Sequence, residues 1–239
     1  MLQSALNLEL VTLPEAPAWP APWSLAVALN EVVLIEGVDP AAAEPLLEVA
    51  ATLKSPVAGK VRHWGLNAEN LPREDLYQLR SRMAYISPRQ VLLRHLSLGE
   101  NIALAVSYRL GCSEAETLIP HADLLEFLNL KANLDRFPAQ VSAAAYHRAV
   151  WARELLKEPE LILVSLAGFQ TTKAGASMWF RVLKDYLARR GAAALVLGES
   201  LEPYYPLGQR LLRLEGRQLL EKPILEHRAR PLTDYLPLV

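Results

Sequence analysis

The chain has 239 residues, of which 25 are basic and 26 acidic, and its formal net charge is −1. This length suffices for one large domain or two packed lobes around a buried core. The balanced charge gives no electrostatic reason to expect a nucleic-acid partner, because phosphate binding needs a concentrated basic surface.

Composition also bounds the compartment. Cys112 is the only cysteine, which excludes an internal disulfide and suits a reducing cytosol. We read no secretion signal at the amino terminus and no apolar run near the roughly 20 residues that span a bilayer, so we expect a cytoplasmic chain. Hydrophobic residues make up 51% of the sequence. That share fits either a large core or an apolar surface covered by a partner.

The elements follow from periodicity and turn residues. The first half is predicted to hold strands at 6–13, 24–29 and 31–37, a proline-rich loop at 14–22, helices at 45–53 and 74–82, and a strand at 83–87. The second half is predicted to hold helices at 99–110, 113–130 (broken by Pro120), 142–156 and 177–190, strands at 161–166 and 193–197, and a hairpin of 210–214 with 218–221. Apolar strands that alternate with helices indicate an α/β fold with a largely parallel core sheet and antiparallel additions.

Four stretches carry a family resemblance. They are EVVLIEG at 31–37, SPVAGKV at 55–61, LLRHLSLGENI at 92–102, and the run from Arg148 to Leu163. Their order and separations resemble the ATPase subunit of ABC transporters over nearly the whole chain. An unrelated α/β protein would explain the alternation of elements, but neither the HLSLGENI stretch nor the spacing from Arg148 to Pro159.

The resemblance implies a domain organisation. We expect one ABC-type nucleotide-binding domain over 1–239. A RecA-like core with a β subdomain would occupy about 1–85 and 158–239, and a helical subdomain about 86–157.

At the phosphate loop the resemblance implies a site that has lost its chemistry. Glycines there let N–H groups surround a phosphate, a lysine reaches the β- and γ-phosphates, and a Ser or Thr hydroxyl holds Mg²⁺. In this chain the first glycine is Gly37, but the lysine position holds Ala43 and the hydroxyl position holds Glu44. Pro40 removes a backbone donor, and acidic Asp39 would repel phosphate. We expect no resident cofactor, with ATP bound only weakly or through a partner subunit.

The other catalytic motifs are altered in the same sense. The Walker B strand ends in Ser165 and Leu166 where the family has an aspartate and a glutamate. The Q-loop glutamine falls on Pro88, although a shifted alignment would place Gln90 there, and the switch histidine falls on Glu199. Because phosphoryl transfer depends on charge stabilisation and positioning, we predict a pseudo-ATPase that is not an enzyme.

Two further positions have alternative interpretations. Ser142 heads the signature helix, where it would contact a partner's ATP or simply cap the helix. Trp19 would stack on adenine or pack on its own domain, and Trp23 has the same alternatives. The five histidines, including His227, show no ligand spacing, so we predict no metal.

The resemblance also implies partners. Four arginines are either solvated charges or the residues that bind the coupling helix of a membrane permease: Arg80, Arg82, Arg89 and Arg94. We expect an inactive subunit, peripheral to the inner membrane, that forms a homodimer or a heterodimer with an active ABC ATPase. The segment 74–83 resembles the ATPases of Mce- and Mla-type phospholipid trafficking, which favours lipid transport, although lipoprotein-release and cell-division ATPases compete.

Two rival hypotheses remain. One is an enzyme with a nucleotide site rebuilt from Asp39, Glu44 and Glu199. The other is a soluble scaffold or sensor on the same fold. ATP turnover that depends on one of these acids would favour the first, and a chain that stays soluble and monomeric beside a permease would favour the second.

Overall fold

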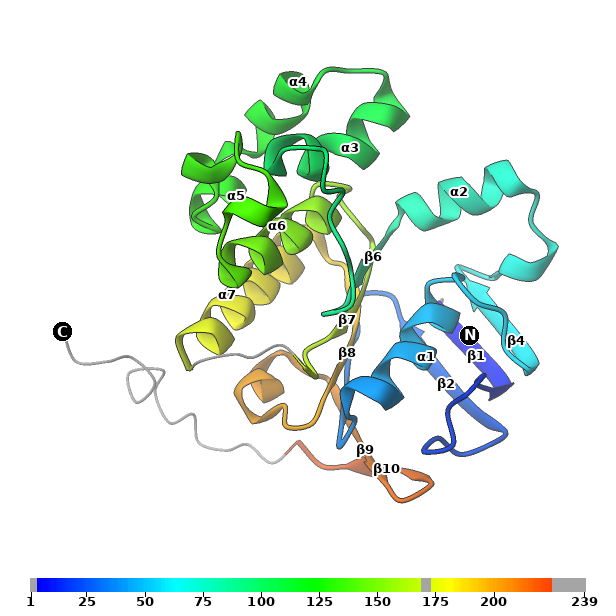
Figure 1. Ribbon diagram of the computed structural model, residues 1–239. Coiled ribbons are helices and arrows are strands. Elements are labelled where there is room, and N and C mark those ends of the chain that lie inside the picture. The colour runs from blue at the N-terminus through cyan, green and yellow to red at the C-terminus, as the bar shows by residue number, and fades with distance from the viewer. Residues whose placement is uncertain (1–3, 169–172, 225–239) are drawn as a thin grey trace.

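The structure, a computed structural model, describes residues 4–168 and 173–224 (Figure 1). Its strands are β1 (Ser4–Thr12), β2 (Trp23–Ala28), β3 (Val32–Glu36), β4 (Ala58–His63), β5 (Leu66–Asn67), β6 (Met83–Ile86), β7 (Leu161–Ser165), β8 (Ala193–Gly198), β9 (Arg210–Glu215) and β10 (Gln218–Lys222). Its α-helices are α1 (Pro40–Ala50), α2 (Arg73–Ser81), α3 (Leu98–Leu110), α4 (Glu114–Leu118), α5 (Ala122–Phe127), α6 (Ala143–Leu155) and α7 (Lys173–Arg190). Short 3₁₀ turns, such as η5 (Glu202–Leu207), connect several of them.

The strands form two sheets. The core sheet has the order β10-β9-β3-β8-β7-β6, and its strands are parallel except for β10, which forms an antiparallel hairpin with β9. Every residue of β3, β7 and β8 is buried, as expected for parallel strands covered on both faces. The second sheet is antiparallel, with the order β2-β1-β4-β5.

Alternating residues of the core sheet face two different layers. Val33 and Ile35 of β3 belong to a cluster with α1 and the antiparallel sheet. Their neighbours Val32 and Leu34 belong to a cluster with α3, α6 and α7. Figure 1 shows the same division, with α1 on one side of the core strands, α6 and α7 on the other, and α3 to α5 gathered at one end.

Local signals explain where the helices of this end begin and stop. The side chain of Ser97 caps α3 and forms a capping box with Glu100, while Gly111 ends the helix in the left-handed conformation. The side chain of Ser142 caps α6 by accepting from the N–H of Ala145. These caps fix the helices that follow the β6 strand and precede β7.

The structure differs from the predicted elements at α1, at β4 and at α7, which begins at Lys173 where the prediction had 177. The predicted helix start at Pro45 was wrong, because α1 begins at Pro40, with Asp39 as its cap and Pro45 inside the helix. No strand was predicted within the stretch 55–61, but its second half belongs to β4, which pairs with β1. The α/β class, the parallel core sheet with antiparallel additions and the helical part are confirmed.

Candidate functional site

The loop between β3 and α1 depends on one glycine. Gly37 has a φ of +78°, and a Cβ atom there would lie 2.7 Å from the carbonyl oxygen of Leu214. The loop's first donors face another loop, because the N–H of Gly37 donates to the carbonyl of Glu199 at 3.2 Å and that of Val38 to the carbonyl of Gly198 at 3.1 Å. The backbone of the phosphate loop is therefore tied to the end of β8.

The amino terminus of α1 is occupied by its own capping residue. Asp39 Oδ1 accepts from the N–H of Ala42 at 2.7 Å, and its carbonyl accepts from the N–H of Ala43 at 2.9 Å. Pro40 follows the cap and has no N–H. A carboxylate thus lies at the positive end of the helix dipole, where a phosphate would otherwise be favoured. Ala43, at the lysine position, is fully buried.

Glu44 turns away from solvent and contacts the end of β6. Its side chain accepts from the hydroxyl of Ser87 at 2.6 Å and from the hydroxyl of Tyr85, and the residue is 5% exposed. Burial as the larger cause and the hydrogen bond to Glu44 as a smaller cause raise the pKa of Tyr85 above its ordinary value. The phenol therefore stays protonated and donates. The position where the family has a metal-binding hydroxyl is consequently a buried carboxylate with two hydroxyl donors.

Three of the predicted motif positions meet near Gly168. A Cβ atom on Gly168 would lie 3.0 Å from Cγ of Pro40 in the phosphate loop and 3.7 Å from Cγ of Pro88 at the Q-loop position. Ser165, at the end of β7, is 1% exposed, and its hydroxyl lies 3.4 Å from the carbonyl of Ala167. The order of the strands therefore brings together the residues that the sequence placed in one site.

The remaining motif residues lie around this centre. The N–H of Leu166 donates to the carbonyl of Leu197 at 2.7 Å, which ties the end of β7 to β8. Glu199 has an exposed side chain, and Ser142 bonds to the N–H of Ala145 at 3.3 Å. The capping role of Ser142 is confirmed, while its contact with a partner's ATP stays a prediction.

Trp19 is packed on its own domain. Its Nε1 donates to the carbonyl of Ala42 in the first turn of α1 at 2.8 Å, and its ring stacks on Trp23 with centroids 5.1 Å apart. Trp19 is 1% exposed. The proline-rich loop is in this way fastened to the phosphate-loop helix.

The four arginines divide into two pairs. Arg80 donates to both the hydroxyl and the carbonyl of Thr52, and Arg82 donates to both carboxylate oxygens of Glu160 at 2.8 and 2.6 Å. Arg89 and Arg94 are exposed, and neither side chain has a hydrogen bond or ion pair within the described part of the chain. Only the second pair presents free guanidinium groups.

Sequence reasoning missed a buried network at the entrance to the phosphate loop. Glu36, the last residue of β3, accepts from the N–H of Leu201, the hydroxyl of Tyr205 and the guanidinium of Arg213. Burial alone would raise the pKa of Glu36, but these donors outweigh burial and hold the pKa below its ordinary value. The available signal was an acidic residue at the end of an otherwise apolar strand.

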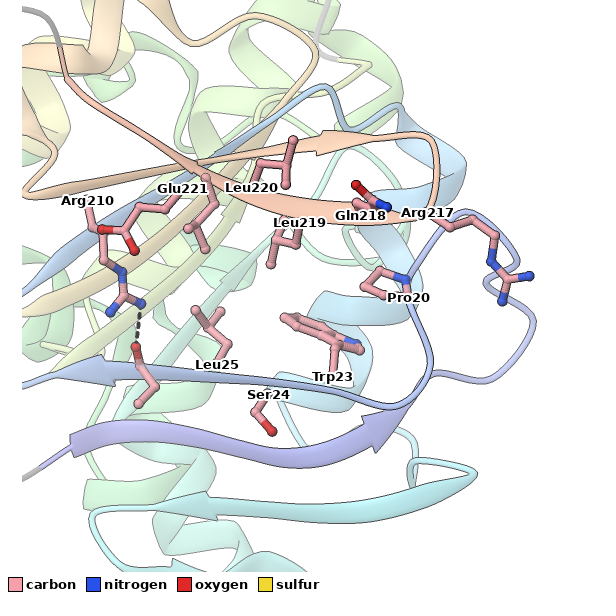
Figure 2. A pocket seen from close by; sticks show the side chains of 12 residues that line it. Pro20, Trp23, Ser24, Leu25, Arg210, Arg217, Gln218, Leu219, Leu220 and Glu221 are labelled. Carbon is pink, nitrogen blue, oxygen red and sulfur yellow. Dashed lines mark hydrogen bonds between the residues drawn. The ribbon is translucent and has the colours of Figure 1, made fainter.

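A surface hollow of about 580 Å³ lies between the edge strands β2 and β10 (Figure 2). Trp23 and Leu25 of β2 face Leu219 of β10 across it, and Arg210 lies at one end. Of the candidate site residues only Trp23, whose ring stacks on Trp19, lines this hollow. It is therefore separate from the loops that converge at Gly168.

Two negative findings concern the described residues alone. No group of three or more His, Cys, Asp or Glu side chains within 4–168 and 173–224 could hold a metal ion, and His227 lies outside these residues. No helix in the same part of the chain is long and apolar enough to cross a membrane.

Together, the two sheets, the helical insert and the loop after β3 define the fold of an ABC nucleotide-binding domain. No protein-family model matches the chain. A solved cassette, the dimeric structure of MJ0796 described as a bacterial ABC transporter cassette, superposes with a TM-score of 0.78 at 18% identity, covering 92% of this chain and 98% of the other.

Curated relatives point to the same class. The methionine import ATP-binding protein MetN of Brucella abortus is 25% identical over 228 residues, covering 90% of this chain. The chain spans 62% of the length of that relative. The lipoprotein-releasing system ATP-binding protein LolD 1 of Rhodospirillum rubrum is 28% identical over 173 residues, covering 72% of this chain and 76% of the relative. The chain is thus similar to ATP-binding subunits of ABC transporters.

Proposed function

We propose that the chain is an ABC-type subunit that does not hydrolyse ATP on its own phosphate loop and acts as a structural or regulatory partner of a membrane permease. The observation that carries this proposal is the state of the loop. The Asp39 carboxylate accepts from the N–H of Ala42, and the N–H groups of Gly37 and Val38 donate to carbonyls at the end of β8 and just after it. Donors that would surround a phosphate are already in use.

The side chains support the same proposal. Phosphoryl transfer needs a cation at the β- and γ-phosphates, a metal ion held by a hydroxyl and an acid, and a group that orients water. Buried Ala43 supplies no cation, and the carboxylate of Glu44 is bonded to two hydroxyls. Ser165 and Leu166 stand where the acids would be. A bound nucleotide triphosphate would also meet the negative charge of Asp39.

The partners follow from the relatives and from the exposed surface. The relatives named above belong to a methionine import and a lipoprotein-releasing system, and the solved cassette is a dimer. We therefore assign this chain a second cassette, either a copy of itself or an active ATPase, and a permease at the inner membrane. In a mixed dimer Ser142 at the start of α6 would contact ATP held by the partner. Of the four candidate arginines, Arg89 and Arg94 have guanidinium groups without a partner among the described residues, which suits them to contact the permease.

Lipid transport is the finer part of the proposal. Its support is the likeness of the segment 74–83 to Mce- and Mla-type ATPases and the similarity to a lipoprotein-releasing subunit. The similarity to a methionine import subunit favours a different transported substrate. Identification of the partner permease distinguishes the two.

Purification of the tagged chain from membranes in mild detergent tests the proposal. We expect a permease and an intact ATPase to co-purify. Turnover should be unchanged by Glu44→Gln in this chain and abolished by replacing the phosphate-loop lysine of the partner ATPase. Recovery of this chain alone, without a membrane partner, would overturn the transporter assignment and favour a soluble scaffold on the same fold.

A further inference from the structure

The core and the helical end of the molecule are joined by two short connections. Residues 87–97 lead from β6 to α3, and residues 156–160 lead from α6 back to β7. Figure 1 shows α3 to α5 gathered at one end of the core strands, while α6 leads back beside them. The ring of Trp151 in α6 stacks on that of Trp179 in α7. Any change in the angle between the two parts must therefore move the residues that follow β6.

A buried carboxylate of the core holds the start of the first connection. Glu44 of α1 accepts from the hydroxyls of Ser87 and Tyr85. The same Ser87 hydroxyl accepts from the N–H of Arg89 at 3.1 Å, and the Ser87 carbonyl accepts from the N–H of Gln90 at 3.1 Å. Glu44 thereby fixes a turn that begins where the core sheet ends.

A second buried carboxylate holds the same turn from the helical side. Glu154, near the end of α6, accepts from the N–H of Tyr85 and from Nε2 of Gln90, both at 3.3 Å. It also pairs with Lys157 at 2.5 Å and with Arg153 at 3.3 Å. Burial would raise the pKa of Glu154, but these two cations outweigh it and keep the pKa below its ordinary value.

We propose that Glu44 and Glu154 form a carboxylate clamp that fixes the angle between the core and the helical end without any bound ligand. Glu44 comes from the core and Glu154 from the helical part, and both bond to residues 85–90. A rotation of one part against the other would separate Glu44 from the Ser87 hydroxyl, or Glu154 from the Tyr85 N–H. The loss of a donor to a buried carboxylate is disfavoured. The clamp restrains the hinge through contacts that are already complete within the chain.

This inference goes beyond the proposed function, because it concerns the hinge whether or not the chain hydrolyses ATP. The alternative is that the two acids only add stability to the folded core. The alternatives differ in what happens to the hinge when one acid is removed and the fold is kept.

The test measures hinge mobility in the full-length chain. Spin labels are placed at Ile119→Cys and Arg217→Cys in a Cys112→Ser background, and the distance distribution is recorded with and without ATP and Mg²⁺. Both label positions are exposed, one on the helical end and one on the β9–β10 turn. Glu44→Ala is compared with Glu48→Ala, the matched control on the same helix, whose carboxylate pairs with Lys54 instead.

We expect a narrow distribution in the unsubstituted chain that ATP does not change. Glu44→Ala should broaden it and should speed amide exchange in residues 87–97 by about tenfold, whereas Glu48→Ala should do neither. If Glu44→Ala does not fold, as judged by circular dichroism, Ser87→Ala replaces it. Ser87→Ala removes one hydrogen bond of the clamp at a smaller loss of stability, and the same distance distribution is measured. The clamp would be overturned if folded Glu44→Ala or Ser87→Ala kept the distance distribution of the unsubstituted chain. It would also be overturned if ATP narrowed the distribution in the unsubstituted chain.

Discussion

His63 should make the stability of this protein fall between pH 7 and pH 5. The ring is fully buried at the end of β4, and its Nε2 lies 2.7 Å from the carbonyl of Ala50. Because a carbonyl only accepts, the neutral ring must carry its proton on Nε2. Nδ1 is buried and has no hydrogen-bond partner among the described residues, so a second proton would find no acceptor there.

The size of the effect follows from the pKa. Burial lowers the pKa of His63 from 6.5 to about 4 despite the hydrogen bond to Ala50. A folded-state pKa below the unfolded one means that the neutral form is favoured in the fold. The stabilisation is therefore complete above pH 6.5 and is lost as the pH falls towards 4. Linkage gives a total loss of about 3 kcal/mol, of which about 2 kcal/mol falls between pH 7 and pH 5.

Urea unfolding at pH 7, 6 and 5 measures this loss. His63→Gln should unfold more easily than the parent at pH 7. Between pH 7 and pH 5, its free energy of unfolding should decrease by about 2 kcal/mol less than that of the parent. His95→Gln, at an exposed histidine, is the matched control and should keep the slope of the parent. If His63→Gln and His95→Gln have the same slope, His63 is not the buried neutral ring described here.

Three other substitutions test the elements around the phosphate loop and the hinge. Gly37→Ala should lower the free energy of unfolding by at least about 2 kcal/mol, because the φ is positive and the new methyl would meet the Leu214 carbonyl. Thermal unfolding measures this loss. Asn101→Ala should cost about 2 kcal/mol and should speed amide exchange in 93–97, since the buried amide bonds to three carbonyls and one N–H of that turn. Glu36→Ala should cost about 2 kcal/mol, because a main-chain N–H and a tyrosine hydroxyl lose their acceptor; a chemical unfolding midpoint within error of the parent would refute that role.

Much of the fold could be predicted because its signals are local. The apolar runs at 31–37 and 161–166 lead directly to the buried strands β3 and β7, and Ser142 caps α6 as expected. Pro120 interrupts the helical stretch that begins at Ser113, where a 3₁₀ turn separates α4 from α5.

The start of α1 was harder to predict because two local signals compete. Both Pro40 and Pro45 are acceptable in the first turn of a helix, and only the hydrogen bond from Ala42 to Asp39 decides between them. The strand β4 was missed for a different reason. Its first three residues are exposed and show no alternation, so its pairing with β1 comes from tertiary contacts.

The partners of the site residues could not be predicted from spacing. Glu44 and Ser87 are separated by 43 positions, and Glu36 and Arg213 by 177. A charge at the end of an apolar strand indicates that a partner must exist, but the sequence does not say which residue the fold supplies. For the same reason the sequence left all four candidate docking arginines equal, whereas only Arg89 and Arg94 lack an internal partner within the described residues.

ATP turnover by the purified chain in the presence of Mg²⁺ is the most direct test of the central claim, measured for the parent, Asp39→Asn and Glu44→Gln. We expect all three proteins to release phosphate no faster than buffer without protein, while an intact cassette assayed as a control hydrolyses ATP. Turnover by the parent that exceeds the background and is lost in Glu44→Gln or Asp39→Asn would contradict the account. That result would show that these acids form a rebuilt catalytic site.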